Sequence, residues 1–79
     1  MYVLESGATG RYYIGVSYRP DDRLAEHNRG QTRSTRSGVP WRKVWQEAHA
    51  DRASAVHRER EIKSWKSRGR ISELIAEAG

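Results

Sequence analysis

The stretch Arg11–Gly30, RYYIGVSYRPDDRLAEHNRG, decides the fold because it changes from a strand pattern to a helix pattern. Residues 11–16 are rich in aromatic and β-branched side chains, as strands usually are. Pro20 suits the first position of a helix, and the two aspartates after it suit the positive end of the helix dipole. We expect this helix to run through His27 and to end near Gly30.

One further strand pattern precedes this stretch and another follows it. Tyr2–Leu4 is short, apolar and β-prone, and the glycine-containing turn at residues 6–10 predicts an antiparallel hairpin with residues 11–16. Residues 31–40 are polar, basic and turn-rich, so we expect a loop there. Trp41–Ala48 has aromatic and β-branched character, which predicts the third strand.

Two helix patterns follow the third strand. We expect Asp51 to open a helix that runs to Lys66, and Gly69 to separate it from an amphipathic helix at Ile71–Ala78. The predicted order is therefore β-β-α-β-α-α. This order is typical of an α/β (α+β) fold in which a small three-stranded antiparallel or mixed sheet is flanked by helices. The chain has 79 residues, so we expect one domain, residues 1–79.

The charge of the chain indicates a polyanionic partner. The formal net charge is +5 and the pI is about 10.1, a surplus that is typical of proteins that bind nucleic acid. A solvated basic surface without a partner would give the same totals. The chain has no cysteine and no apolar run long enough to cross a bilayer, so we expect a cytoplasmic protein that does not engage a membrane.

Glu59 interrupts the apolar face of the helix expected at residues 51–66. Ala55, Val56 and Ile62 recur at helical spacing, and Glu59 lies three or four residues from each of them. A carboxylate that faces a core is costly unless it is paired or binds a cation. Two interpretations remain: Glu59 pairs with Lys63 or a nearby arginine at the edge of the apolar face, or it belongs to a metal or catalytic site.

Four polar or aromatic residues and one glycine also need an explanation. Arg23 and His27 share a helix face, either as surface residues or as a phosphate ligand and a proton acceptor. Tyr2 and Tyr13 lie on paired strands, either as core aromatics or as a site in which one tyrosine acts as a base beside a cation. Gly15, inside a strand, indicates that another group approaches the backbone closely.

Together these residues resemble the GIY-YIG endonuclease family, in particular its small stand-alone members. The resemblance is carried by MYVL at 1–4, YIG at 13–15, RLAEH at 23–27, TR at 35–36 with PW at 40–41, and AVHREREIKSW at 55–65. It covers nearly the whole chain. The spacing is specific, because Arg23 follows Tyr13 by ten residues, His27 comes four later, and Glu59 stands in an A-x-x-x-E-x-x-I-K helix.

The chain departs from the family pattern at three places. The first motif has Tyr2 but lacks the usual glycine and isoleucine, and Arg19 stands where many members have an aspartate before the helix. The repair-nuclease branch carries a lysine after the YIG glycine, and Val16 stands there instead. This difference indicates the branch that uses a histidine, here His27.

The resemblance implies metal-dependent hydrolysis of a DNA phosphodiester bond, with one divalent ion, Mg²⁺ or Mn²⁺, held by Glu59 and water. The catalytic residues that it implies are Tyr2, Tyr13, Arg23, His27 and Glu59. Arg23 would stabilise the charge on the phosphate, and one tyrosine would orient or deprotonate the attacking water. His27 would either take the proton onward or lower the effective pKa of the tyrosine next to it. Which tyrosine acts on the water stays open. Further DNA contacts are expected from Arg33, Thr35, Arg36, Lys63, Lys66 and Arg68.

A different function would use the same fold. A non-catalytic nucleic-acid-binding module, or a subunit of a larger nuclease, would keep the basic surface without cleaving DNA. The expected partner is DNA, with branched and single-stranded forms both open. No element for reading bases is evident, so a protein partner that supplies targeting is a second open expectation.

Overall fold

The computed structural model of the protein, which describes residues 1–65 and 67–78, has a three-stranded antiparallel sheet at its centre. Strand β1 (Tyr2–Ser6) lies between β2 (Tyr12–Gly15) and β3 (Trp41–Gln46). Both neighbours of β1 run antiparallel to it, which decides between the antiparallel and the mixed sheet. The predicted fold class, a small sheet flanked by helices in this order, is confirmed.

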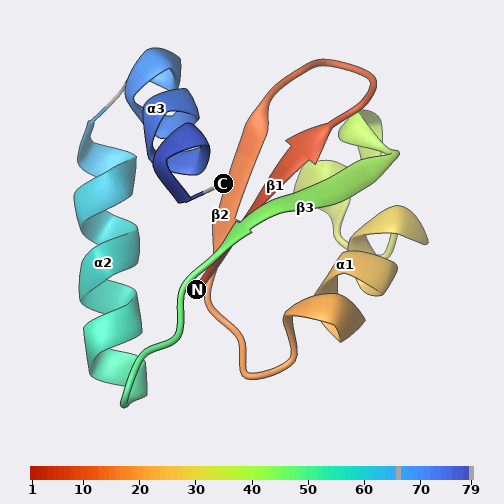
Figure 1. Ribbon diagram of the computed structural model, residues 1–79. Helices are drawn as coiled ribbons and strands as arrows, with labels where there is room; N and C mark the ends of the chain where they lie inside the picture. The colour runs from red at the N-terminus through yellow and green to blue at the C-terminus, as the bar shows by residue number, and fades with distance from the viewer. Residues whose placement is uncertain (66, 79) are drawn as a thin grey trace.

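Helices cover both faces of the sheet (Figure 1). Helix α1 (Pro20–Asn28) and the 3-10 helix η1 (Arg33–Gly38) lie on one face, and α2 (Arg52–Ser64) and α3 (Arg68–Ala78) lie on the other. Within residues 1–65 and 67–78, none of these helices combines the length and the apolar character that a membrane span requires.

Strand alternation divides the core into two clusters, because successive side chains of a strand point to opposite faces. Val3 and Ile14 pack with Ile62 of α2 on the α2–α3 face. Tyr2 and Leu4 belong to the cluster on the α1 face. Val3, Leu4 and Ile62 have no exposed surface, and complete burial of such a side chain contributes about 1.5–3 kcal/mol. The two clusters hold both helical layers against one sheet.

Ser6 connects the β1–β2 turn to η1. The sequence placed Ser6 in the turn, but it is the last residue of β1. Its hydroxyl accepts hydrogen bonds from the backbone N–H groups of Ala8 and Thr9 and donates one to the carbonyl of Gly38 at 2.6 Å. This buried hydroxyl therefore closes the turn and fixes the end of η1 beside the sheet.

Two segments differ from the sequence prediction. Residues 31–40, expected as a loop, contain η1. Gly69 does not separate two helices, because α3 begins at Arg68 and includes it. A glycine inside a helix costs only about 1 kcal/mol relative to alanine, so neighbouring contacts can outweigh it.

Helix α2 begins as predicted. Asp51 is its N-cap, and its side chain accepts a hydrogen bond from the backbone N–H of Ser54 at 2.8 Å. The helix ends at Ser64. Lys66, where the sequence placed its end, lies outside the described residues.

Candidate active site

Tyr2, Tyr13, Arg23 and His27 meet on the face of the sheet that α1 covers. The strands supply the two tyrosines, whose ring centroids lie 6.4 Å apart. Helix α1 supplies the arginine and the histidine. The His27 ring packs edge-on against Tyr13, with 4.7 Å between the ring centroids. The structure thus brings together four of the five residues that the resemblance to the family implied.

Gly15 makes room for Tyr2. The two residues are paired across the β1–β2 ladder. A Cβ atom on residue 15 would lie 2.5 Å from the Tyr2 hydroxyl, closer than any side chain allows. The glycine in the strand therefore has the explanation that the sequence suggested: the group that approaches its backbone is the Tyr2 phenol.

His27 is completely buried, which excludes the surface position that the sequence left open. Its Nδ1 lies 2.8 Å from the hydroxyl of Thr35, and its Nε2 lies 3.5 Å from the hydroxyl of Tyr2. Burial, followed by the positive charge of Arg23, lowers the pKa of His27 below its ordinary value, and Glu26 opposes this change. The ring is therefore neutral at neutral pH.

Arg23 lies at the border between this buried group and solvent. Its side chain is 41% exposed, and its Nη1 donates to Oε2 of Glu26 at 2.7 Å. Its guanidinium also lies close enough to the Tyr2 hydroxyl to influence the pKa of that phenol. Burial raises the pKa of Tyr2 above its ordinary value, and the nearby Arg23 opposes that rise. Tyr2 is 1% exposed, so Arg23 is the member of this pair that solvent reaches.

A polar cleft of about 190 Å³ borders the cluster. Tyr13, Thr35 and Trp41 line it on the side of the cluster, and the β1–β2 turn and η1 supply the rest of its wall. That remaining wall is mainly polar and carries one arginine; its residues are Thr9, Arg11, Tyr12, Ser34, Ser37 and Gly38. Tyr13 is half-buried and is the tyrosine of the cluster that this cleft reaches.

Glu59 lies apart from the cluster. It belongs to α2, which covers the opposite face of the sheet (Figure 1). Its carboxylate pairs with Nζ of Lys63 at 2.5 Å, as one of the two interpretations of the sequence required. In the described part of the chain, no hydrogen bond or ion pair joins Glu59 to the four clustered residues, and no group of three or more His, Asp or Glu side chains could hold a metal.

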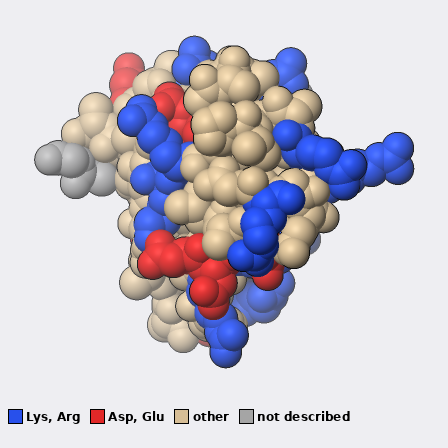
Figure 2. All heavy atoms as spheres, turned by 90° about the vertical axis from the view of Figure 1, so that its right-hand side faces the viewer, with Lys and Arg blue, Asp and Glu red and all other residues tan. Residues whose placement is uncertain are grey.

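Basic side chains surround the face on which the cluster lies. Figure 2 views the molecule from the α1 side and shows lysine and arginine side chains around a broad uncharged area. Arg33 and Arg36, two of the predicted DNA contacts, are exposed on η1. Thr35 between them differs, because it is 3% exposed and its hydroxyl contacts His27.

The remaining predicted DNA contacts lie elsewhere. Lys63 is on α2 beside Glu59. Arg68 is exposed on α3, where its guanidinium lies 5.3 Å from the centre of the Tyr12 ring and 3.9 Å from the carboxylate of Glu5. Lys66 is outside the described residues. The predicted contacts therefore do not form one patch.

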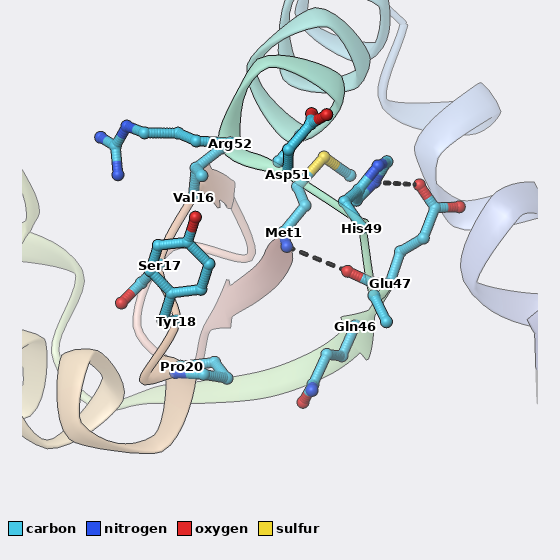
Figure 3. Close-up of a pocket in the computed structure, with 12 residues that line it drawn as sticks. Met1, Val16, Ser17, Tyr18, Pro20, Gln46, Glu47, His49, Asp51 and Arg52 are labelled. Carbon is cyan, nitrogen blue, oxygen red and sulfur yellow. Dashed lines mark hydrogen bonds and ion pairs between the residues drawn. The ribbon is translucent and has the colours of Figure 1, made fainter.

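A second hollow, of about 200 Å³, lies where the segments around residues 16–20 and 46–52 meet (Figure 3). None of the four clustered residues lines it. Two of its polar side chains already have partners: His49 Nε2 lies 2.7 Å from Glu47, and Asp51 caps α2. This hollow offers no arrangement of groups that resembles the cluster.

The supporting contacts of three residues of the site escaped the sequence analysis. Asn28 binds both backbone groups of Trp41, with its Nδ2 donating to the carbonyl at 2.9 Å and its Oδ1 accepting from the N–H at 2.6 Å. Glu26 orients Arg23, and the spacing of three residues on one helix face could have indicated that pair. Thr35 gave no such signal for its contact with His27, because it lies in a segment without periodicity.

The comparison with protein families agrees with this geometry. The profile described as the GIY-YIG catalytic domain matches residues 1–72. Neither the curated proteins nor the solved structures that were searched contain a significant match. The family match covers most of the chain, including both strand tyrosines, Arg23, His27 and Glu59. The chain therefore belongs to the GIY-YIG family of catalytic domains.

Proposed function

We propose that residues 1–79 form a single metal-dependent DNA endonuclease domain that hydrolyses a phosphodiester bond. Membership of the GIY-YIG family makes it a nuclease-type domain with a nucleic-acid substrate. The observation that carries the proposal is the meeting of Arg23 and Tyr13, both accessible, above the buried pair of Tyr2 and His27. Tyr13 lines the polar cleft, and Arg23, which does not line it, is the solvent-accessible cation of the same cluster. A phenol and a cation of this kind are suited to binding and attacking a phosphate.

Exposure divides the four residues into two pairs with different roles. Arg23 and Tyr13 can touch a substrate without rearrangement, because the side chain of one is 41% exposed and the ring of the other borders the cleft. Arg23 would donate to the oxygens of the scissile phosphate and stabilise the charge that develops there. The hydroxyl of Tyr13 would direct the attacking water. This geometry favours Tyr13 over Tyr2 for that step.

Tyr2 and His27 would support the exposed pair from below. The Tyr2 hydroxyl lies beside the guanidinium of Arg23, and the His27 ring packs against that of Tyr13. Both supporting residues are almost or completely buried, so neither meets the substrate directly in this arrangement. A site built on strands and a helix keeps such contacts within the narrow tolerance that catalysis requires.

Nucleases of this family typically use a divalent metal, and Glu59 is the residue that we propose to hold it. Its carboxylate is 22% exposed and is paired with a lysine that is 54% exposed, so Lys63 can move away when an ion arrives. One carboxylate fits Mg²⁺ or Mn²⁺ that retains most of its waters, and does not fit an all-protein cage. When bound, the ion would supply Lewis-acid charge to a phosphate oxygen, although Glu59 lies on the face of the sheet opposite Arg23 and Tyr13 in this structure.

The hollows on either side of the edge strand β2 support a path for a DNA strand. Arg11 and Tyr12 line both the cleft beside Tyr13 and a shallow hollow that Lys63 and Arg68 border on the other side of the strand. A strand of DNA that crosses β2 here would meet basic side chains on both faces. We therefore add Arg11 to the proposed phosphate contacts, whose effect is on affinity and salt dependence.

A nicking assay on supercoiled, branched and single-stranded DNA tests this proposal. We expect cleavage with Mg²⁺ or Mn²⁺ and none with EDTA. Glu59→Gln should abolish cleavage and change DNA binding little, whereas Glu61→Gln, on the exposed side of the same helix, should cleave normally. Full activity of the Glu59→Gln protein would contradict the metal role of Glu59.

Tyr13 and Tyr18 offer a second matched pair of variants. Tyr13→Phe removes only the hydroxyl at the cleft and should lower the cleavage rate by roughly 100-fold or more. Tyr18→Phe makes the same change at a side chain that is 79% exposed and outside the cluster, and it should leave the rate unchanged. Equal rates for the two variants would show that Tyr13 does not direct the water.

The separation of Glu59 from the cluster favours a second candidate function. A nucleic-acid-binding module without activity would tolerate the Glu59–Lys63 pair as a permanent surface ion pair. Such a module would bind DNA with a steep salt dependence and would cleave none of the three substrates with either metal. The same nicking assay on the wild-type protein therefore distinguishes the two functions.

A further inference from the structure

We propose that Thr35 is a positioning residue, which fixes the tautomer of His27 and, through Tyr2, the place of Arg23. The proposal rests on the proposed function for its effect on cleavage, but the tautomer itself can be measured without any activity. Thr35 is buried in η1, and its hydroxyl lies between the His27 ring and the backbone carbonyl of Thr32.

The hydroxyl of Thr35 has one hydrogen and two neighbours that could accept it. It donates to the carbonyl of Thr32 at 3.3 Å, and a carbonyl can only accept. In the proposed arrangement that hydrogen stays directed at the Thr32 carbonyl, so Nδ1 of His27, 2.8 Å from the hydroxyl, carries a hydrogen and donates it to Thr35. A neutral imidazole with a hydrogen on Nδ1 has a free electron pair on Nε2.

The contacts of Tyr2 with Arg23 and His27 favour the same tautomer of His27. A guanidinium can only donate, so the Tyr2 oxygen would be the acceptor toward the nearby Arg23. The Tyr2 hydrogen then points to Nε2 of His27, 3.5 Å away. Every donor from Arg23 through Tyr2, His27 and Thr35 thus points in one direction, toward the Thr32 carbonyl.

The opposite tautomer would break this order. A hydrogen on Nε2 would point at the Tyr2 oxygen, where it would compete with Arg23, and the Tyr2 hydrogen would lose its acceptor. A buried hydroxyl without a partner is costly. Within residues 1–65 and 67–78, every buried polar side-chain atom has a neighbour within hydrogen-bonding distance.

The tautomer of His27 affects Arg23, the residue proposed to bind the phosphate. Arg23 is held by Glu26 on its own helix and lies beside the Tyr2 oxygen, and the second contact depends on the His27 tautomer. Valine has nearly the shape of threonine but cannot bind Nδ1. In Thr35→Val the ring should therefore move its hydrogen to Nε2, and Arg23 should lose its place at Tyr2. Thr35→Ser keeps the hydroxyl and should keep the arrangement.

Long-range ¹⁵N NMR of the histidine rings in the full chain tests this, because protonated and unprotonated ring nitrogens are distinguished directly. His49→Gln and His57→Gln variants identify the signals of His27. We expect the Nδ1–H tautomer in the wild type and in Thr35→Ser, and the Nε2–H tautomer in Thr35→Val. We also expect Thr35→Val to lower kcat about tenfold or more with little change in KM, and Thr35→Ser to restore most of it.

The outcomes are distinct. An Nε2–H tautomer in the wild type overturns the proposal, as does a Thr35→Val protein that keeps the Nδ1–H tautomer or switches tautomer with full activity. If Thr35→Val does not fold, the wild type and Thr35→Ser still decide: the Nδ1–H form in both supports the role of the hydroxyl, and the Nε2–H form in either contradicts it. A wild type that never cleaves DNA would contradict the proposed function, while the tautomers would still settle the role of Thr35 toward His27.

Discussion

Gly15 illustrates how a single missing side chain shapes the site. Because a Cβ atom there would lie 2.5 Å from the Tyr2 hydroxyl, Gly15→Ala must displace the phenol beside Arg23. We expect a loss of about 1–3 kcal/mol in the free energy of unfolding, as is typical when a packed core receives extra atoms. Urea unfolding measures the loss, and the cleavage rate should fall with it.

Gly69→Ala is the matched control at the residue scale. A Cβ atom there meets nothing closer than 3.7 Å, and the residue lies inside α3. The substitution should stabilise the protein by about 0.5–1 kcal/mol, because alanine loses less backbone freedom on folding than glycine. If Gly15→Ala and Gly69→Ala changed the free energy of unfolding equally, the close approach of the Tyr2 hydroxyl to Gly15 would be contradicted.

The burial of His27 predicts how stability depends on pH. Its pKa in the folded protein lies below the ordinary value of 6.5, chiefly because the ring is desolvated. As the pH falls through about 6.5, the unfolded chain takes up a proton before the folded protein does, so the wild type should lose stability there. The groups around the ring are Tyr2, Tyr13, Arg23, Glu26 and Thr35.

Urea unfolding at a series of pH values separates this effect from general acid unfolding. In His27→Gln the position no longer titrates, so its disadvantage relative to the wild type should shrink as the pH falls below about 6.5. His57→Gln, at an exposed position on α2, serves as the control. A constant difference between the wild type and His27→Gln across this range would show that His27 is not desolvated in the folded protein.

At the scale of elements, Asn28 joins the end of α1 to the start of β3. Its amide satisfies both backbone groups of Trp41, at 2.9 Å and 2.6 Å. Asn28→Ala would leave these groups partly buried without a partner, at a cost of about 1–3 kcal/mol. Arg29→Ala, the exposed neighbour, should change the free energy of unfolding by less than about 0.5 kcal/mol. Equal midpoints of urea unfolding for Asn28→Ala and Arg29→Ala would show that the hydrogen bonds from Asn28 to Trp41 contribute nothing to stability.

The hairpin and the first helix could be predicted from the sequence because each element has a clear period. Strand alternation puts Tyr2 and Tyr13 on one face, and helical spacing puts Arg23 and His27 on another. Only the family resemblance placed the two faces opposite each other. The structure then confirmed the fold and brought these four residues together.

The parts that the sequence did not reveal depend on contacts between distant segments. Helix η1 has no apolar period, so nothing predicted that it would bury Thr35 against His27. The depth at which His27 lies depends on how closely α1 packs on the sheet. For Glu59 the helical pattern left two interpretations, and the structure shows the ion pair with Lys63 while its role toward a metal stays a prediction.

At the scale of the whole molecule, the path proposed over β2 predicts a change in salt dependence. Replacing a phosphate contact reduces the slope of log Kd against log salt by about 0.7–0.9. We expect this reduction for Arg11→Ala, because Arg11 lines the hollows on both sides of β2. Arg60→Ala removes an exposed arginine of α2 that lines neither hollow, and it should leave the slope unchanged. If both variants reduced the slope equally, the effect would come from the overall charge of the protein and not from a DNA strand that crosses β2.

The central claim is that the two helical layers and the sheet present Arg23 to a scissile phosphate. Single-turnover cleavage of DNA by Arg23→Ala, with DNA binding measured in parallel, tests it most directly. Arg19→Ala, at an exposed arginine one turn earlier, is the control. We predict that Arg23→Ala cleaves at least about 100-fold more slowly than the wild type and Arg19→Ala, while its affinity for DNA changes far less. Cleavage by Arg23→Ala at the wild-type rate would contradict the account.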